Sequence, residues 1–216
     1  MAKNRLLIIS SVLVLPFNLF IFGTASANFG ARSGFFIGCI FYWIYVSLFV
    51  LLLNKDDFLY VGKTVSSNAG CRYPRQFKTA AFLPAAGAFL VALFPNIKNL
   101  TLKTGLIILV VSIVNGTVEE IYWRGLYLRR YKENLYAVLI VSPVLFALMH
   151  FSFLAIKGMT YEGGAFALVG GALLMGLLWS YVSFKLNTIR HCIAGHIVVN
   201  ICAFTGLFVE NGLQLF

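Results

Sequence analysis

The sequence predicts an all-α fold: a polytopic transmembrane helical bundle of about seven to eight helices. Composition is the first observation, because the 216 residues are 60% hydrophobic and only 11% charged, far too apolar for a soluble domain of this size. The second is a series of apolar runs that approach or exceed the roughly 18 to 20 residues a helix needs to cross a bilayer. The third is that no alternating segments of about 10 residues, the pattern of a transmembrane barrel, are evident.

Seven hydrophobic segments predict the membrane helices. They cover approximately residues 6–24, 34–53, 79–95, 104–120, 135–155, 164–184 and 189–208. The fourth segment continues through Glu119 into a polar stretch that ends near Tyr131. Residues 54–78 form the longest polar stretch and are expected to be a loop with room for a short surface helix. No internal repeat is evident, so we expect a single membrane domain spanning residues 1–216.

Basic residues predict the orientation of the chain, because cytoplasmic loops of membrane proteins collect Lys and Arg. This also explains the net charge of +10 without a nucleic acid partner. With the N-terminus inside, twelve basic residues fall on the inner side: Lys3, Arg5, Lys55, Lys63, Arg72, Arg75, Lys78, Arg129, Arg130, Lys132, Lys185 and Arg190. Four fall on the outer side: Arg32, Lys98, Lys103 and Lys157. The split predicts that the N-terminus and the 54–78 loop are cytoplasmic and that the C-terminus is outside.

The N-terminal segment admits two interpretations. A basic start, an apolar run and "TASAN" resemble a signal peptide whose cleavage site ends at Ala27. The apolar run from Leu6 to Gly23 is longer than a usual signal core, which favours an uncleaved first helix. Cleavage would leave the topology of the remaining segments unchanged.

A few ionisable side chains lie within apolar segments, where each costs at least about 2.5 to 3.5 kcal/mol on insertion scales. Such groups usually have a partner or a function. With one amide, the set is Glu119, Glu120, Arg124, His150, His191, His196 and Asn200. His191 lies beside Arg190 at the expected inner boundary and faces away from His196, so we expect it to be non-catalytic.

The first motif is "EEIYWR", residues 119–124. Residues four apart share a face of an α-helix, so Glu120 and Arg124 suit an ion pair. Glu119 is rotated by about 100° from Glu120 and is expected to face a different neighbour. The alternative for this motif alone is a pair of ordinary interface charges, because the basic sequence "YLRRYK" follows directly.

Two further motifs carry histidines: "FALMH", where Phe146 and His150 share a face, and "HIVVN", where His196 and Asn200 do. A lone histidine in an apolar helix is more often a hydrogen-bonded packing residue, and the second pair alone fits an interhelical contact worth about 0.6 kcal/mol. Combined with Glu119, these groups could form a hydrolytic site. A carboxylate can accept a proton from water, imidazoles can orient that water or protonate a leaving amine, and an amide N–H can stabilise an oxyanion.

The three motifs, Glu-Glu-x-x-x-Arg, Phe-x-x-x-His and His-x-x-x-Asn in this order, resemble those of the CPBP family, also called the Abi family. This family comprises type II CAAX prenyl endopeptidases and bacteriocin-processing or immunity proteins. The resemblance covers about residues 79–208, and residues 1–78 would add two N-terminal helices and a basic cytoplasmic loop. It implies a peptidase that works inside the membrane without a nucleophilic side chain.

The resemblance also implies roles for the motif residues. Glu119 would be the catalytic base and His150 would assist it, whereas His196 and Asn200 would form the oxyanion side. The supporting residues would be Glu120, Arg124 and Phe146. We favour chemistry without a cofactor, although two histidines and a glutamate could also bind zinc with an open water position.

Other intramembrane peptidase chemistries are disfavoured by the sequence. It contains no His-Glu-x-x-His motif and no Gly-x-Ser-x-Gly motif. The only aspartates, Asp56 and Asp57, are adjacent in the polar 54–78 stretch, so they cannot form a dyad on two helices.

Several alternatives remain open at this stage. A non-catalytic membrane immunity or scaffold protein would use the polar groups only to hold its helices together, and a proton or ion pathway could be built from the same groups. For the peptidase we expect a membrane-embedded or lipid-modified peptide substrate, and we expect a multi-pass protein of a bacterial plasma membrane.

Overall fold

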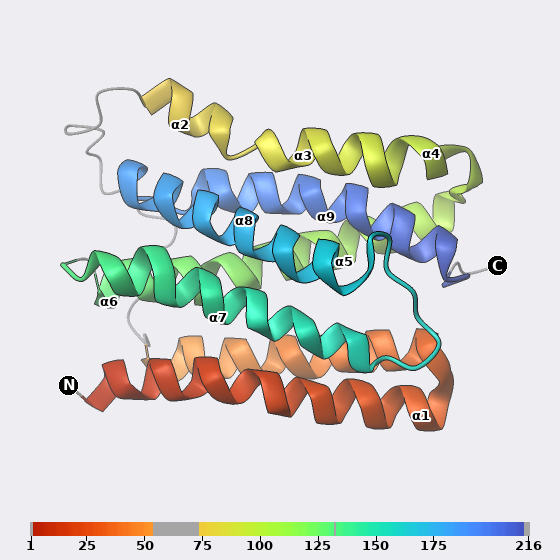
Figure 1. Ribbon diagram of the computed structural model, residues 1–216, viewed down its shortest axis with the longest axis horizontal. Helices are drawn as coiled ribbons and strands as arrows, with labels where there is room; N and C mark the ends of the chain where they lie inside the picture. The colour runs from red at the N-terminus through yellow and green to blue at the C-terminus, as the bar shows by residue number, and fades with distance from the viewer. Residues whose placement is uncertain (1, 54–73, 132, 214–216) are drawn as a thin grey trace.

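The computed structural model describes residues 2–53, 74–131 and 133–213, and Figure 1 shows them as a bundle of long helices. The α-helices are α1 (Ala2–Leu53), α2 (Pro74–Ala80), α3 (Leu83–Ala88), α4 (Phe94–Asn96), α5 (Leu102–Glu120), α6 (Tyr127–Arg130), α7 (Ser142–Met149), α8 (Gly164–Leu186) and α9 (Arg190–Glu210). Three π-helical turns cover Phe89–Leu93, Ile121–Leu126 and Ala137–Val141, and 3-10 turns cover Ile97–Asn99 and His150–Ala155. The described residues include no strand, which confirms the all-α fold.

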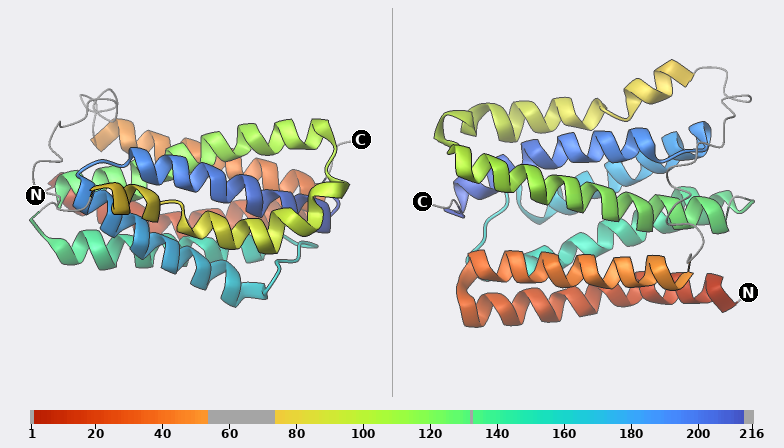
Figure 2. Two further views of the ribbon diagram at one scale, coloured as in Figure 1. Left: turned by 90° about the horizontal axis from the view of Figure 1, so that it is seen from above. Right: turned by 180° about the vertical axis from the view of Figure 1, so that it is seen from behind.

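Helix α1 is a hairpin of two membrane-spanning halves. A straight helix of 52 residues would be about 78 Å long, far more than the roughly 30 Å of a hydrocarbon core. The chain reverses at Gly30, whose φ of 79° and ψ of 169° are non-helical, and Figure 2 shows the two halves side by side. Glycines allow the close approach, because a Cβ on Gly38 would lie 2.0 Å from the Phe22 ring.

Six helical stretches of the described chain are long and apolar enough to cross a membrane. Their bounds are Lys3–Leu53, Pro74–Asn99, Leu102–Arg130, Ala137–Ala155, Gly164–Leu186 and Arg190–Glu210. Because the first turns back at Gly30, the six stretches correspond to the seven segments predicted from the sequence. The predicted loop 54–78 lies mostly outside the described residues, and its last part is helical, since α2 begins at Pro74.

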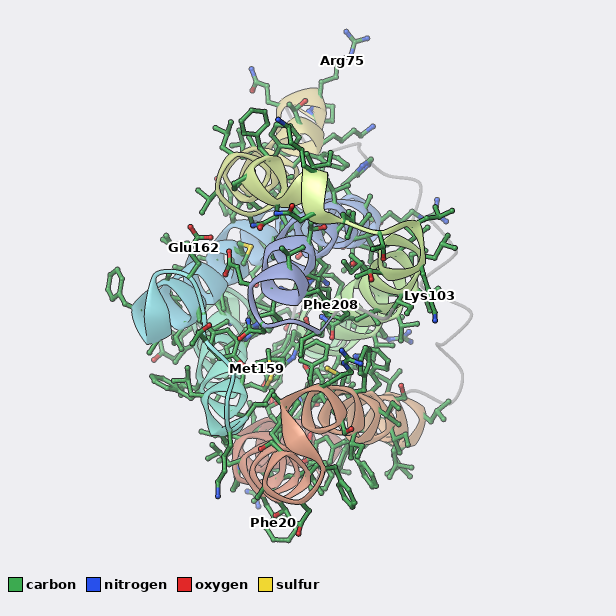
Figure 3. All side chains as sticks on the ribbon, turned by 90° about the vertical axis from the view of Figure 1, so that its right-hand side faces the viewer. Phe20, Arg75, Lys103, Met159, Glu162 and Phe208 are labelled. Atoms are coloured by element: carbon green, nitrogen blue, oxygen red, sulfur yellow. The ribbon has the colours of Figure 1, made fainter. Side chains whose placement is uncertain are left out.

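The surface of the bundle is apolar where lipid would contact it. Seen end-on in Figure 3, Phe20 points away from the bundle and is 67% exposed, whereas Phe208 points inward and is 1% exposed. Phe166 and Leu102 are also strongly exposed, at 89% and 82%. Exposed large apolar side chains on this scale are expected for an integral membrane protein and not for a soluble one.

The two ends of the bundle hold different segments of the chain. At one end, the Tyr131 hydroxyl donates to the Asn4 carbonyl over 2.9 Å, and the Arg130 guanidinium donates to the Leu53 carbonyl. At the other end, Arg32 Nη2 donates to the Gly212 carbonyl over 3.0 Å. The first residues and the C-terminal end of α9 therefore lie at opposite ends, as predicted and as Figure 1 shows.

The first half of α1 is part of the core. Leu7, Val14 and Phe22 are fully buried. Buried hydroxyls bind this half to the polar stretch after α5: the hydroxyl oxygens of Ser10 and Tyr122 are 2.7 Å apart. These contacts place the first half of α1 beside the stretch that directly follows the acidic pair at the end of α5.

Candidate active site

Glu119 and Glu120 are the last two residues of α5. The helix begins at Leu102, and the side chain of its N-cap residue Thr101 accepts from the Thr104 N–H and so caps the first turn. After Glu120 the backbone widens into a π-helical turn, Ile121–Leu126, which carries Arg124. Such turns interrupt α-helices mostly at functional sites. The acidic pair therefore sits at a local break in a membrane helix.

Close packing of α5 on α9 brings His196 to the acidic pair. A Cβ on Gly116 would lie 3.0 Å from Ile197, so glycine at this position lets the two helices approach closely without displacing Ile197. His196, the residue before Ile197, therefore lies beside the two carboxylates. Its Nδ1 is 2.9 Å from Glu120 Oε1, and its Nε2 is 3.3 Å from Glu119 Oε2. The expectation that the two carboxylates face different neighbours is thus incomplete, because one imidazole inserted from α9 contacts both.

Glu120 and Arg124 form the ion pair predicted from their spacing. The distance between Arg124 Nη1 and Glu120 Oε1 is 3.0 Å, and both side chains are fully buried. The contact is an ion pair without the alignment of a hydrogen bond. The guanidinium carbon also lies 4.1 Å from the centroid of the Phe146 ring and 5.6 Å from that of Trp179, so aromatic faces stabilise the buried cation.

Phe146 and His150 share a face of the chain, as predicted. His150 Nδ1 is 2.9 Å from the Phe146 carbonyl oxygen, and the ring centroids are 4.6 Å apart. The Phe146 ring also meets His196 edge-on, with centroids 6.2 Å apart. Phe146 therefore contacts both histidines and Arg124 and links the two histidine motifs. His150 is partly buried and begins the 3-10 turn after α7.

Asn200 lies one turn beyond His196 on α9 and is 7% exposed. Within the described part of the chain, its Nδ2 has no hydrogen-bond partner. A buried amide donor without a partner is costly in an apolar setting. This donor is therefore available to an acceptor that the chain itself does not supply.

Residues that no motif contains complete the surroundings of Glu119. Asn115 Nδ2 donates to Glu119 Oε2 over 3.0 Å, and Trp43 Nε1 donates to Asn115 Oδ1 over 2.8 Å. The Tyr42 hydroxyl interacts with the Glu119 carboxylate. Asn115 could have been found in the sequence, because it lies four residues before Glu119 in the same apolar segment. Tyr42 and Trp43 carry no such signal, because only the fold brings α1 here.

Trp179 on α8 fixes the other face of His196. The two rings stack with centroids 4.5 Å apart, and the Trp179 indole donates to the Ala81 carbonyl over 2.9 Å. That carbonyl is free to accept because the helical hydrogen bonding is interrupted between α2 and α3, where Ala85 N–H donates to Phe82 instead. The imidazole is thus held by stacking as well as by the two carboxylates.

The zinc alternative can be compared with this geometry. Among residues 2–53, 74–131 and 133–213, no three His, Cys, Asp or Glu side chains are arranged to hold a metal ion. His196 instead has both ring nitrogens beside carboxylates, and His150 has Nδ1 on a backbone carbonyl.

The arrangement combines a buried carboxylate, an imidazole in contact with it and an amide donor one helical turn away. These are the groups that activation of water and stabilisation of an oxyanion need. The sequence predicted the members on α5 and α9. It did not predict that His196 bridges Glu119 and Glu120.

Comparison with known proteins gives a family match to the segment that carries Glu119, His196 and Asn200. The model of the family described as Type II CAAX prenyl endopeptidase Rce1-like matches residues 101–202. The match begins at the N-cap of α5 and ends just beyond Asn200, so it includes all three motifs and confirms their resemblance. It leaves out Tyr42 and Trp43. No curated protein and no solved structure gives a significant match.

Proposed function

We propose that this protein hydrolyses peptide bonds inside the membrane with water activated by Glu119, because residues 101–202 match the model of the Rce1-like family of type II CAAX prenyl endopeptidases. The family supports an intramembrane endopeptidase of the CAAX type in general, and the six apolar stretches support an integral membrane protein. The identity of the base and the assisting groups is our proposal. It rests on one observation above all, the contact of Glu119 with His196 in a buried site.

The proposed reaction begins with Glu119 accepting a proton from water while the water oxygen bonds to the carbonyl carbon of the peptide. The carbonyl oxygen becomes an oxyanion. Asn200 Nδ2, which has no partner among the described residues, would donate to it, a type of contact worth about 10²- to 10³-fold in rate. Collapse then breaks the carbon–nitrogen bond, and the proton held by Glu119 passes to the leaving amine.

The two histidines would act from different positions. His150 would assist Glu119 in orienting the attacking water, from the ring nitrogen that does not face the Phe146 carbonyl. His196 would line the oxyanion side and also hold the carboxylates in place, because its ring is clamped by Trp179 and lies between Glu119 and Glu120. Glu120, Arg124 and Phe146 would support this arrangement.

The substrate class follows from the same premise. A site at the end of buried α5 is reached from the bilayer or from its surface, so the substrate would be a membrane-associated peptide. We propose a lipid-modified or hydrophobic segment whose anchor stays in the bilayer while the peptide bond enters the site. The location would be a plasma membrane.

Conversion of Glu119 to glutamine tests the catalytic role. Glu119→Gln keeps the shape and much of the hydrogen bonding but cannot accept a proton, and a general base contributes roughly 10²- to 10⁴-fold. We expect cleavage of an internally quenched farnesylated CAAX peptide by purified protein in lipid nanodiscs to fall to near background. Glu133→Gln is the matched control, because Glu133 is an exposed carboxylate outside the site.

Two results with Glu119→Gln would contradict the proposed role of Glu119. Full cleavage by Glu119→Gln would show that Glu119 is not the base. Full function of that variant in cells, together with no cleavage by the wild type, would favour a non-catalytic immunity or scaffold protein.

The second test concerns the metal. We propose that the reaction uses no metal, so the wild type should cleave the peptide at full rate after treatment with a strong chelator, and elemental analysis should find far less than one zinc per chain. A zinc site would show ligand distances of about 2.0 to 2.2 Å. Stoichiometric zinc that is lost together with activity in His150→Ala would replace this proposal with the zinc-dependent mechanism.

A further inference from the structure

Two side chains outside the three motifs approach the Glu119 carboxylate as hydrogen-bond donors. Asn115 Nδ2 lies 3.0 Å from Glu119 Oε2, and the Tyr42 hydroxyl interacts with the same carboxylate. Tyr42 is fully buried and Asn115 is 7% exposed. Each of the two is bound on its far side by the indole of a tryptophan, and this shared feature determines the direction of both hydrogen bonds.

The first pair is Trp43 and Asn115. An indole N–H can only donate, and Trp43 Nε1 lies 2.8 Å from Asn115 Oδ1. The amide oxygen of Asn115 must therefore face Trp43, and its NH₂ group must face Glu119. A flipped amide would place two donors against each other at Trp43 and two acceptors against each other at Glu119.

The second pair is Trp123 and Tyr42. Trp123 Nε1 donates to the Tyr42 hydroxyl oxygen over 3.0 Å. Since that oxygen already accepts from the indole, its own O–H is left to donate to Glu119. In both pairs, an indole N–H, which can only donate, fixes the orientation of a group that can both donate and accept.

We propose that these two relays, Trp43–Asn115 and Trp123–Tyr42, are positioning residues that hold the Glu119 carboxylate for catalysis. The inference rests on the proposed function of Glu119 and deepens it. An ionised carboxylate is an acceptor only, so two oriented donors match it and restrict its rotation. A base held in one orientation meets its substrate without reorganisation.

The relays also give the N-terminal hairpin a role in the site. Tyr42 and Trp43 lie in the second half of α1, outside the range 101–202 that the family model matches. The base sits on α5, and its orientation depends on a helix pair added before the matched domain. Residues 34–53 would therefore be required for turnover as well as for stability.

Kinetics of single variants form the first test, with the internally quenched farnesylated peptide as probe. Asn115→Leu and Tyr42→Phe each remove one donor to a charged group, so kcat should fall about ten- to hundredfold with KM little changed. Tyr45→Phe is the matched control. Tyr45 lies on the same half of α1, but its hydroxyl donates to the Ser10 carbonyl, and its loss should leave kcat unchanged.

A double-mutant cycle distinguishes positioning from packing. Trp43→Phe should lower kcat in the wild-type background and have no further effect in the Asn115→Leu background, because the relay is already broken. A merely structural Trp43 would give the same loss in both backgrounds. Asn115→Leu and Tyr42→Phe belong to different relays, so their losses should multiply.

A spectroscopic test does not depend on turnover. The protein has three tryptophans, and nitrogen-15 labelling gives one indole signal for each in an NMR spectrum of micelles. Asn115→Leu should shift the Trp43 signal, Tyr42→Phe the Trp123 signal, and Glu119→Gln both. Trp179 serves as reference in the first two variants, because its indole donates to the Ala81 carbonyl.

The outcomes separate this inference from the proposed function. If the wild type does not cleave the peptide, the proposed function fails, and the indole signals alone decide whether the relays reach Glu119. An unchanged Trp43 signal in Asn115→Leu, unchanged Trp43 and Trp123 signals in Glu119→Gln, or purely additive losses in the Trp43 cycle would overturn the relays even in an active enzyme.

Discussion

Glu119 and Glu120 are adjacent and share one histidine, but their remaining partners differ. Glu119 has the neutral donors Asn115 and Tyr42, whereas Glu120 has the cation Arg124. A carboxylate among neutral donors can exchange its proton without leaving an opposite charge unbalanced. A carboxylate paired with a buried guanidinium cannot be protonated in this way, because the cation would then lack its counter-charge. This difference of environment is the physical basis for giving the two residues different roles.

The stability of two glutamine variants should reflect that difference. Glu120→Gln keeps an acceptor for His196 but leaves Arg124 as an uncompensated charge in a fully buried place, and breaking a buried pair costs about 3 to 5 kcal/mol. We expect lower protein levels and a lower melting temperature in detergent. Glu119→Gln is the matched control and should melt near the wild type. Equal melting temperatures would show that the ion pair does not hold this turn.

At this scale the sequence predicted contacts within a helix better than contacts between helices. The pairs Glu120–Arg124 and Phe146–His150 follow from a spacing of four residues, and the structure contains both. The position of His196 between the carboxylates depends on how closely α9 approaches α5, which one glycine permits. The spacing of residues within either helix does not predict how closely the two helices approach each other.

At the scale of elements, the seven apolar segments were predictable and their irregularities were not. Length and hydropathy suffice for a membrane helix. The π-helical turn after Glu120 and the 3-10 turn at His150 accept hydrogen bonds from neighbouring segments, which a hydropathy pattern does not show. One of these is the Ser142 hydroxyl, which donates to the Trp123 carbonyl inside the π-helical turn.

Two glycines test how closely α9 must pack on the turn at Ala81, between α2 and α3. A Cβ on Gly195 would lie 2.2 Å from the Ala81 carbonyl oxygen, which also accepts from Trp179. Gly195→Ala should therefore separate the helices and cost at least about 1 to 3 kcal/mol. A Cβ on Gly87 meets nothing within 4 Å, so Gly87→Ala should gain up to about 1 kcal/mol of helix propensity.

Thermal unfolding in detergent and the cleavage assay should separate the two variants. Gly195→Ala should lose stability and, since it displaces the acceptor of the indole stacked on His196, also lose activity. Gly87→Ala should keep both. A stable and active Gly195→Ala would mean that the turn at Ala81 does not need this close approach to α9.

At the scale of the whole molecule, the matched domain and the N-terminal hairpin form one site. The family match begins at residue 101, yet Tyr42 of α1 interacts with the Glu119 carboxylate, and Trp43 donates to Asn115, which binds the same carboxylate. From the sequence alone, residues 1–78 are expected to add two helices and a loop to a catalytic core at about residues 79–208. The contacts make the second half of α1 part of the surroundings of Glu119.

Orientation in the membrane gives the last prediction. The contacts of Tyr131 with Asn4 and of Arg130 with Leu53 gather three chain segments at one end of the bundle, and that end carries the excess of basic residues. Because Lys and Arg collect in cytoplasmic loops, a reporter inserted after Lys63, outside the described residues, should be cytoplasmic. A reporter fused after Phe216 should be outside, since the end of α9 lies with Arg32 at the opposite end. If both reporters respond on the same side, the chain crosses the membrane an even number of times after Lys63 and the assignment of spans is wrong. If both respond on the side opposite to that predicted, the spans hold and the charge argument fails.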